Sequence, residues 1–377
     1  MDFLIKNGTV YDPAEHRYWK GDIAMVDGKV AAPKANHEYR QVVDADGCIV
    51  TTGLIDYHVH YMRGASEGGV NADVVSSCCG ITTAVDGGSA GTGMYEHIRN
   101  TLVANVQVRF LNCLLVASGG QSNNQYPENL NPVLFDEKKI VEFFRKHSDN
   151  LVGLKTRISH GIIDGDLAVE SVRRTVEIAE KAGTRVIVHV TDCSIPLDQL
   201  ASMLRPGDVI CHIYQGKGEN ICLGKDGKVL PGLLEARERG VLFDASNGRS
   251  NFDLKICQAA VEQGFVPDVI SSDINSSSCF LQPLHSLPRI LSKYLDFGMR
   301  LEDVLDCATI KPAQLIGMPE LGSMAEGTTA DVVILKVKQK DVEYSDITGN
   351  RFTGHQVIVP QMTFKDGECV FCQADFA

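Results

Sequence analysis

The chain has 377 residues, of which 44% are hydrophobic and 22% are charged. Such a composition excludes a disordered or fibrous protein, and the length is sufficient for one barrel-sized domain with a smaller addition. The formal net charge of −12, with no run of Lys or Arg, argues against a nucleic acid or an anionic membrane as partner and leaves a small molecule as the expected ligand.

The N-terminus begins directly with a strand-like pattern and shows no signal peptide. No apolar stretch approaches the roughly 18 residues that a membrane span requires, so we expect a cytoplasmic protein. Twelve cysteines are scattered along the chain, which favours reduced and mostly buried thiols over a disulfide framework. Cys369 and Cys372 have the spacing of one half of a zinc site, but no second pair accompanies them, and a zinc knuckle is not expected.

Both ends of the chain show short strands separated by turns such as Asn7-Gly8 and Asp27-Gly28. The expected strands are residues 3–10, 21–26, 29–32, 330–337, 356–359 and 370–372. Neither end is large enough to fold alone. We therefore predict one small β-sandwich domain formed from residues 1–52 and 320–377, which would place the two termini near each other.

The segment between these ends, residues 53–319, alternates short apolar strands with amphipathic helices. The expected strands are residues 53–58, 81–86, 108–117, 152–158, 185–190, 209–213, 241–245 and 269–273. Helical patterns at residues 167–182 and 254–263 each end before a glycine. Eight repeats over this length predict an α/β fold with a (β/α)8 TIM barrel, although periodicity alone leaves an open doubly wound sheet as an alternative.

The first strand of this segment ends in the sequence His58-Val59-His60. Alternate residues of a strand share one face, so the two imidazoles are expected to point the same way. Neutral imidazole is a common metal ligand, and the pair predicts half of a zinc-like site. The same pattern also arises by chance, so further residues of the chain are needed to decide whether a metal site is present.

Ionisable residues also follow later strands, at the positions that a barrel turns toward its active-site mouth. They are Lys155, His189, His212 and Asp273. Taken singly, His189 or His212 is explained as a hydrogen-bonded core histidine and Asp273 as a helix N-cap. Taken together with His58 and His60, they indicate a catalytic site, because burial of each one without a partner would be costly.

In these residues the chain resembles the metal-dependent amidohydrolase superfamily, whose barrel carries HxH on the first strand, Lys on the fourth, His on the fifth and sixth, and Asp on the eighth. The resemblance covers nearly the whole chain and includes GLIDYHVH, GITTAVDGG and GSMAEGTTADVVIL. The nearest likeness within it is the dihydroorotase-related deacetylase-like branch, sometimes labelled adenine-deaminase-like. That likeness rests on VGLKTRIS, HIYQGK, VLFDASNGRSNF and DITGNR.

The lysine is the informative position. An ammonium cannot lie between two cations, so Lys155 is either a substrate-facing cation beside a single metal or an anionic oxygen ligand. The resemblance implies the second case, in which a CO2-derived carbamate on Lys155 bridges two divalent metals, expected to be zinc, with manganese or cobalt as alternatives. It also implies that His58, His60 and Asp273 complete one metal site, and that His189 and His212 complete the other.

In that arrangement a hydroxide bridging the two metals is the nucleophile, and the metals polarise the scissile carbonyl. Asp273 is the predicted catalytic residue, which takes the proton of the nucleophile and passes it to the leaving group.

Four further residues are predicted to bind the substrate. Arg157 shares the direction of Lys155 on its strand and suits a substrate carboxylate, although an ion pair at the barrel rim explains it equally well. Asn247 and Gly248 follow the seventh strand, where deacetylase-like relatives resemble each other in having a His-Gly pair. Tyr214 follows His212, with ordinary packing as its alternative.

We therefore predict an enzyme: a binuclear metal-dependent amidohydrolase that cleaves a small N-acyl amide or an acyl ester of a carboxylate-bearing substrate. The alternatives are a cyclic amide hydrolase of the dihydroorotase or hydantoinase kind and a mononuclear deaminase of an amino-heterocycle. Arg63 lies one position later than the Arg of dihydroorotases, which counts against that activity. A non-enzymatic scaffold is not expected because every ligand position is filled, and a homo-oligomer is expected from the size of the enzyme.

Overall fold

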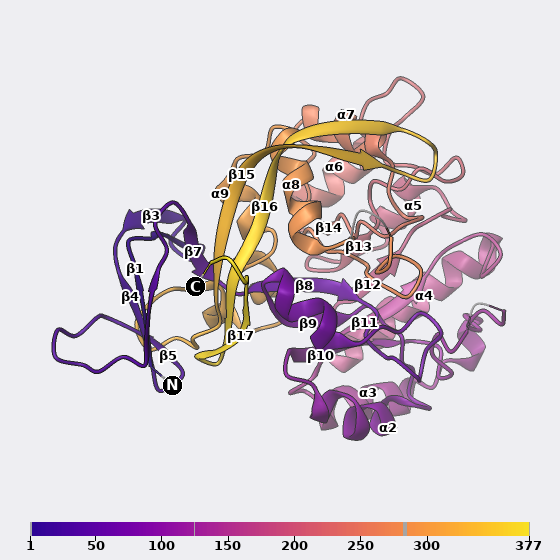
Figure 1. Cartoon of the computed structure of the whole chain (residues 1–377). Coiled ribbons are helices and arrows are strands. Elements are labelled where there is room, and N and C mark those ends of the chain that lie inside the picture. The colour runs from indigo at the N-terminus through magenta and orange to yellow at the C-terminus, as the bar shows by residue number, and fades with distance from the viewer. Residues whose placement is uncertain (1, 124, 282–284, 377) are drawn as a thin grey trace.

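The computed structural model describes residues 2–123, 125–281 and 285–376. It contains a barrel of parallel strands surrounded by helices, beside a β-rich part built from both ends of the chain (Figure 1). The prediction of a TIM barrel with a β-sandwich from both termini is confirmed. The limits at residues 52/53 and 319/320 stay a prediction. No helix in these ranges is both long and apolar enough to cross a membrane.

The barrel wall is a parallel sheet of seven strands within the described ranges. In spatial order they are β8 (Leu54–Val59), β9 (Ile81–Asp86), β10 (Arg109–Leu115), β11 (Leu151–Arg157), β12 (Val186–His189), β13 (Val209–Cys211) and β14 (Leu242–Asp244). Apolar residues from alternate positions of these strands, such as Ile55 and Tyr57, fill its interior.

The eighth strand, predicted at residues 269–273, is not a regular strand. It is joined to its neighbours by two parallel bridges, Asp244 with Val269 and Val59 with Ile274, which close the barrel. The physical reason is the backbone of Asp273, whose φ of 48° is left-handed and interrupts the extended ladder.

Helices cover the outside of the barrel and connect its strands. They are α1 (Ala72–Ser76), α2 (Tyr95–Thr101), α3 (Glu137–Lys146), α4 (Gly165–Ala182), α5 (Leu197–Ser202), α6 (Pro231–Glu238), α7 (Leu254–Glu262), α8 (Leu287–Asp296), α9 (Leu301–Asp306) and α10 (Ile310–Leu315), with the short 3-10 helices η1 (Ser77–Cys79), η2 (Val103–Asn105), η3 (Pro132–Leu134) and η4 (Pro319–Gly322). The predicted helices correspond to α4 and α7. Gly183 ends α4 in a left-handed conformation with φ 67°, as its position after the last apolar turn predicts.

Two sheets form the sandwich. One has the order β5-β4-β1-β6 and the other β17-β16-β15-β7-β2-β3. Their bounds are β1 (Phe3–Lys6), β2 (Thr9–Asp12), β3 (Arg17–Lys20), β4 (Ile23–Val26), β5 (Lys29–Ala31), β6 (Gln41–Asp44), β7 (Ile49–Thr52), β15 (Val332–Ser345), β16 (Arg351–Lys365) and β17 (Glu368–Cys372). A separate apolar core, which includes Phe3, Val50 and Phe364, lies between them. The strand predicted at residues 3–10 is in fact two strands, because Asn7 takes a positive φ of 62°.

The hairpin of β15 and β16 is much longer than its predicted strands at residues 330–337 and 356–359. It leaves the sandwich and runs over α8, and its tip lies beside the start of α7 (Figure 1). At the tip, Asp346 accepts a hydrogen bond from the backbone N–H of Leu254 at 2.9 Å, and the Thr348 hydroxyl donates to Asp253 at 3.2 Å. These bonds attach the C-terminal hairpin to the carboxyl-terminal side of the barrel.

The burial of the cysteines agrees with the expectation from the sequence. All twelve are free and most are buried, so the predicted burial of the thiols is confirmed.

Asp331 connects the sandwich to the barrel. Its buried carboxylate accepts from Arg109 of β10 at 2.5 Å and from Lys365 of β16 at 3.2 Å. The backbone N–H of Asp366 donates to the same carboxylate at 2.9 Å. Two cations from different domains therefore share one buried anion.

We predict that Asp331→Ala lowers the free energy of unfolding by about 3 kcal/mol, because it removes the buried carboxylate that Arg109 and Lys365 share. The exposed Asp366 is then the remaining anion beside these two cations. Urea unfolding followed by circular dichroism measures the change. Asp341→Ala is the control, since Asp341 is an exposed carboxylate of β15 paired with His355, and it should change stability little. Equal effects of the two variants would contradict this role of Asp331.

Candidate metal centre

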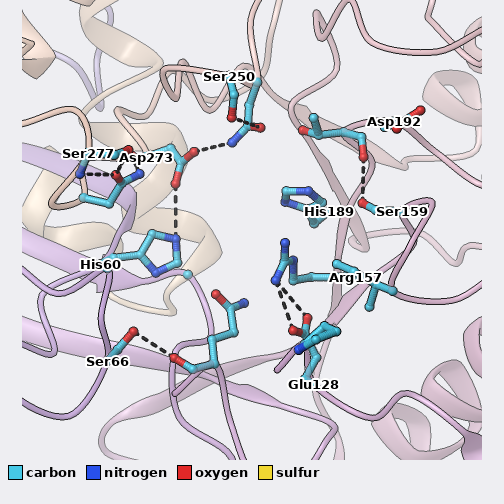
Figure 2. A pocket seen from close by; sticks show the side chains of 18 of the residues that line it. His60, Ser66, Glu128, Arg157, Ser159, His189, Asp192, Ser250, Asp273 and Ser277 are labelled. Carbon is cyan, nitrogen blue, oxygen red and sulfur yellow. Dashed lines mark hydrogen bonds and ion pairs between the residues drawn. The ribbon is translucent and has the colours of Figure 1, made fainter. Parts of the chain in front are cut away.

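The predicted ligands lie at the carboxyl-terminal ends of the barrel strands, and most of them line one cavity of about 630 Å³ (Figure 2). The members that line it are His58, His60, Lys155, His189 and Asp273. They come from β8, β11, β12 and the segment after Val269, which are far apart in sequence. The closure of the barrel brings them together, as the strand-end pattern predicted.

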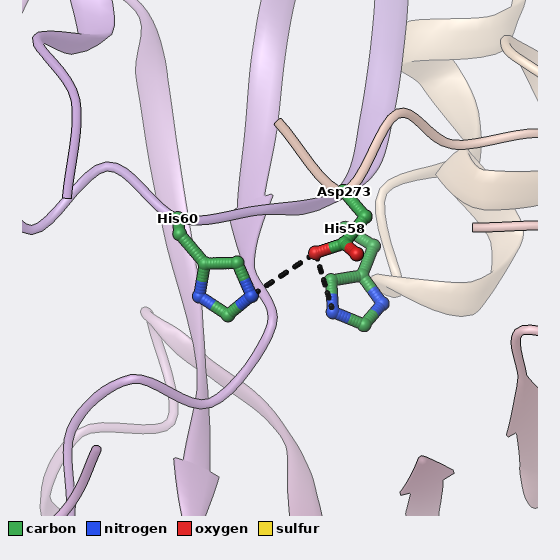
Figure 3. Close-up of side chains that lie close together, drawn as sticks. All are labelled: His58, His60 and Asp273. Atoms are coloured by element: carbon green, nitrogen blue, oxygen red, sulfur yellow. Dashed lines mark ion pairs between the residues drawn. The ribbon is translucent and has the colours of Figure 1, made fainter. Parts of the chain in front are cut away.

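His58, His60 and Asp273 form the tightest group (Figure 3). The Nε2 atom of His60 lies 3.2 Å from Oδ1 of Asp273, and Nε2 of His58 lies 3.8 Å from the same oxygen. Ligand atoms about 2.1 Å from a tetrahedral metal are about 3.4 Å from one another. The three side chains therefore have the spacing that one small cation requires.

The orientation of the His60 ring is fixed by a hydrogen bond at Nδ1, the nitrogen that faces away from Asp273. Its Nδ1 lies 2.8 Å from Oγ of Ser89, and the Ser89 hydroxyl donates to Oδ2 of Asp86 at 3.0 Å. Since this hydroxyl proton is used on Asp86, Ser89 accepts from Nδ1–H of His60. The Nε2 lone pair of His60 is then directed toward Asp273 and is available to a metal.

A similar series of hydrogen bonds holds the His58 ring. Its Nδ1 lies 3.1 Å from the Ser246 hydroxyl, which donates to Asp244 at 2.5 Å. Asp244 also accepts from Ser271 at 2.8 Å, so its oxygens are already engaged. His58, Cys211 and Asp244 also lie close enough to hold an ion, but we assign Asp244 to the support of His58 because of these bonds.

His212 provides the test of whether this site fits a metal. Its Nδ1 donates to the backbone carbonyl of Ser246 at 2.9 Å. Its Nε2 is buried and has no hydrogen-bond partner among the described residues. A buried nitrogen with an unused lone pair is costly unless a ligand takes it. The His189 ring lies 4.4 Å from the His212 ring, so the two imidazoles form a second pair of candidate ligands.

The histidines are held in the neutral form that binds metals. Burial lowers the pKa of His212 to about 4, although the charge of Asp273 opposes this shift. Burial, with nearby positive charge as a smaller cause, lowers the pKa of His58 and His189 well below the ordinary value. Neutral imidazoles at physiological pH are the ligand form.

Asp273 is packed closely on all sides. Burial acts to raise its pKa, but the polar groups around its oxygens, among them the donor Asn251, outweigh this effect, so the pKa lies below its ordinary value. Asn251 donates to its Oδ2 at 2.6 Å. Gly248 lies against the same oxygen, since a Cβ at this position would stand 1.9 Å from Oδ2. The carboxylate is therefore held ionised and oriented.

Lys155 lies deep in the cavity and is 1% exposed. Its Nζ has one hydrogen-bonding neighbour, Sγ of Cys211 at 3.7 Å. In the described ranges no carboxylate lies within ion-pair distance of this amine. A buried ammonium without a counter-ion carries a large desolvation cost, which chemical conversion to an anion would remove.

Arg157 lines the cavity, as predicted, but it is already paired. Its Nη1 donates to both oxygens of Glu128 at 3.0 and 3.1 Å (Figure 2). The Glu128 side chain is buried. This is the ion pair that the sequence left as the alternative to substrate binding. Glu128 itself was missed, because it lies in an irregular loop before η3 without any periodic signal.

The other predicted substrate-binding residues do not line this cavity. Tyr214 is fully buried in the core, and its hydroxyl donates to the backbone carbonyl of Phe265 at 2.8 Å, which corresponds to the packing alternative. Asn247 turns away from the metal ligands and bonds with Lys293 and Tyr294. Gly248 has no side chain, which allows the loop to lie close to the Asp273 carboxylate, and it does not line this cavity. Direct contact of these three residues with substrate stays a prediction, and they lie outside this cavity because tertiary packing sets the direction of a loop after a strand.

Other residues of the site, whether in the cavity lining or behind the ligands, were missed or left open. Ser89 and Ser246 follow β9 and β14, so their strand-end positions were a usable signal, whereas Asn251 lies deeper in a loop. His160, which the sequence left open, lines the cavity and its Nδ1 lies 2.5 Å from Asp164.

A closed barrel that gathers histidines, a buried lysine and an aspartate at its carboxyl-terminal rim defines a metal-dependent hydrolase. Residues 49–370 match the profile of the amidohydrolase family, and the chain belongs to that family. The predicted resemblance is confirmed, and the protein is a metal-dependent hydrolase that acts on carbon–nitrogen bonds.

Individual relatives carry several names. The chain is 30% identical over 338 residues to a deacetylase from Agrobacterium fabrum, with 88% of this chain and 80% of the relative covered. It is 23% identical to a deacetylase from Enterococcus faecalis, with 97% and 98% covered. A crystal structure of a dihydroorotase superposes with a TM-score of 0.88 at 26% identity, covering 98% of this chain and 99% of the other. That of an adenine deaminase superposes with a TM-score of 0.89 at 23% identity, covering 99% and 100%, and shows the shared fold alone.

We predict that Ser89→Ala lowers metal affinity about 10- to 100-fold, because His60 loses the acceptor that fixes its orientation. Competition with a chromogenic chelator measures the affinity. Ser66→Ala is the matched control: Ser66 lines the same cavity, but its hydroxyl donates to the backbone carbonyl of Gln121 and contacts no predicted ligand. If both variants bind metal like the wild type, Ser89 does not orient His60.

Proposed function

We propose that the protein is a binuclear hydrolase of the deacetylase type, which cleaves a small N-acyl amide or acyl ester of a carboxylate-bearing substrate. The observation that supports this proposal is the convergence of six side chains at one end of the barrel. They are His58, His60, Lys155, His189, His212 and Asp273. The 30% identity with the Agrobacterium fabrum deacetylase favours acyl transfer to water over the other activities named among the relatives.

The donor set suits two divalent cations. His58, His60 and Asp273 would hold one, and His189 and His212 the other, with Lys155 as a carbamate between them. Nitrogen and carboxylate oxygen donors at these positions favour zinc, and manganese or cobalt would fit the same set. When bound, two such cations supply an activated water at neutral pH and polarise the acyl carbonyl.

Asp273 is the proposed proton carrier of the reaction. Asn251 orients its carboxylate, and its lowered pKa keeps it ionised in the free enzyme. It takes a proton from the attacking water and delivers it to the departing amine or alcohol. The imidazoles of His60, His58 and His212 are each held through Nδ1, by Ser89, by Ser246 and by a backbone carbonyl respectively, so they hold position rather than exchange protons.

Arg157 is the proposed contact for the substrate carboxylate. Glu128 accepts from its Nη1. Among the described residues Nε and Nη2 have no hydrogen-bond partner, so they can donate to a second carboxylate. A guanidinium held by one buried acid is already oriented, which lowers the entropic cost of binding another.

Cyclic amide hydrolysis is the second candidate, because a dihydroorotase structure is 26% identical over nearly the whole chain. The position of Arg63 weighs against it. Arg63 is exposed and does not line the metal cavity, so it is not placed to hold a substrate there.

The proposal is tested by a substrate panel on enzyme loaded with zinc, manganese or cobalt. The panel contains N-acetyl amino acids, O-acetyl esters of 2-hydroxy acids, dihydroorotate, hydantoin and adenine. We expect an acetyl compound with a free carboxylate to be cleaved fastest. A preference for dihydroorotate or hydantoin would establish the second candidate, and release of ammonia from adenine would establish a deaminase.

On the best substrate, Asp273→Asn should lower kcat by at least about a hundred-fold, as the loss of a general base does, while metal is largely retained. Asp164→Asn is the control, because Asp164 is an exposed carboxylate beside the cavity that pairs with His160, and it should keep near-normal kcat. If Asp273→Asn keeps more than about a tenth of the wild-type kcat, another group carries the proton.

We also predict that Lys155→Ala removes the second metal, because the bridging oxygens are lost. Elemental analysis should give about two metals per wild-type chain and fewer in the variant. A short carboxylic acid such as propionate, added with bicarbonate, should restore part of the metal and activity. Lys217→Ala, at an exposed lysine of the same cavity, should keep both metals. A wild-type enzyme that is fully active with one metal would overturn the binuclear proposal.

A further inference from the structure

A second cavity of about 340 Å³ lies outside the metal centre. Its walls come from α8, from the loop of residues 247–252 and from the β15–β16 hairpin, which runs over α8 (Figure 1). The metal cavity has a different lining, since no residue belongs to both sets. The loop that contains Gly248 and Asn251 separates the two.

Lys293 of α8 is the most unusual group in this cavity. It is 7% exposed, and its Nζ donates to the side-chain oxygen of Asn247 at 2.8 Å. The same nitrogen lies 3.7 Å from the centre of the Phe252 ring. Among the described residues, no carboxylate lies within ion-pair distance of it. The amine is thus surrounded by neutral groups, which is costly for a cation.

Arg289 lies one helical turn before Lys293 and lines the same cavity. Its guanidinium donates to the backbone carbonyl of Glu343 and stacks 4.8 Å from the centre of the Tyr344 ring. These partners are also neutral, and within the described ranges no ion pair of Arg289 is found.

The two acids of the cavity wall are occupied by the hairpin itself. Asp346 accepts from the backbone N–H groups of Leu254 and Asn350, and Glu343 accepts from the Thr353 hydroxyl. Two cations one turn apart therefore face the cavity while the nearby carboxylates are used elsewhere.

We propose that this second cavity binds a small organic carboxylate, with Arg289 and Lys293 on its charged end and Phe252, Tyr344 and Ile347 around its apolar body. A carboxylate between the two cations would supply the missing counter-charge beside the buried Lys293. The aromatic rings and the exposed Ile347 favour a ligand with an apolar part over a bare inorganic anion. Burial lowers the pKa of Lys293 to about 7, which agrees with a cation that lacks its anion.

The location of the ligand is tested with 4-bromobenzoate soaked into crystals of the metal-loaded enzyme, because the anomalous signal of bromine identifies its position. We expect a peak beside Phe252 and Tyr344, with the carboxylate toward Arg289. A carboxylate also has affinity for metals, so a peak confined to the cavity of His60 and Asp273 would overturn the proposal.

The affinity for 4-bromobenzoate in solution is the second test of the proposal. Calorimetric titration with 4-bromobenzoate should show binding that weakens about tenfold or more in Arg289→Met and in Lys293→Met, while 4-bromobenzamide and inorganic phosphate bind poorly. Arg145→Met, at an exposed arginine of α3, removes the same charge elsewhere and should leave affinity unchanged. Arg289 is half-buried, so its variant remains informative even if Lys293→Met fails to fold. Equal affinity in wild type and Arg289→Met would overturn the proposal, and this readout does not depend on hydrolytic activity.

Discussion

The burial of the Lys155 amine is the constraint on which the rest of the centre depends. An ammonium at this depth would face His58, His189 and His212 without an anion in contact, and its charge already contributes, after burial, to the low pKa of His58. Burial lowers the pKa of His58, His189 and His212, so these three imidazoles stay neutral and avoid mutual repulsion. Each of His58, His60 and His212 has its Nδ1 turned away from the cavity toward an oxygen. The site is therefore suited to positive charge that enters from outside, and the proposed carbamate on Lys155 would supply the anion that the site lacks.

Backbone strain is also found at this place, where three of the eight described non-glycine residues with positive φ lie. His212, Ser246 and Asp273 have φ values of 63°, 36° and 48°, a left-handed region that residues with a side chain rarely adopt. Each of the three is tied by specific hydrogen bonds, such as Asp273 N–H to the carbonyl of His58 at 2.7 Å. In a regular strand each of these side chains would lie along the wall of the barrel. The left-handed turn instead directs it across the mouth, and the closed sheet stabilises the conformation.

The sequence predicted the barrel, the terminal sandwich and the set of side chains that meet at the barrel mouth, because strand periodicity and strand ends are local signals. The eighth strand was placed correctly but is irregular, since its conformation depends on Asp273 and its neighbours rather than on propensity. Arg157 was correctly oriented, but its partner Glu128 comes from a loop without periodicity. Tyr214 illustrates the remaining gap: a polar residue two positions after His212 faces the core, because the chain turns at the left-handed His212.

Asn247 shows how a departure from the family pattern acquires a different meaning in three dimensions. Deacetylase-like relatives resemble each other in having a His-Gly pair after the seventh strand, and the Asn247 that stands there in this chain is predicted to bind the substrate. In the structure the Asn247 side chain faces Lys293 and Tyr294, in the second cavity. Gly248 alone faces the metal centre, where it allows the Asp273 carboxylate to approach the loop. A neutral amide oxygen accepts from Lys293 without bringing another ionisable ring beside a buried amine, so the substitution concerns the charge balance of α8 rather than the chemistry at the metals.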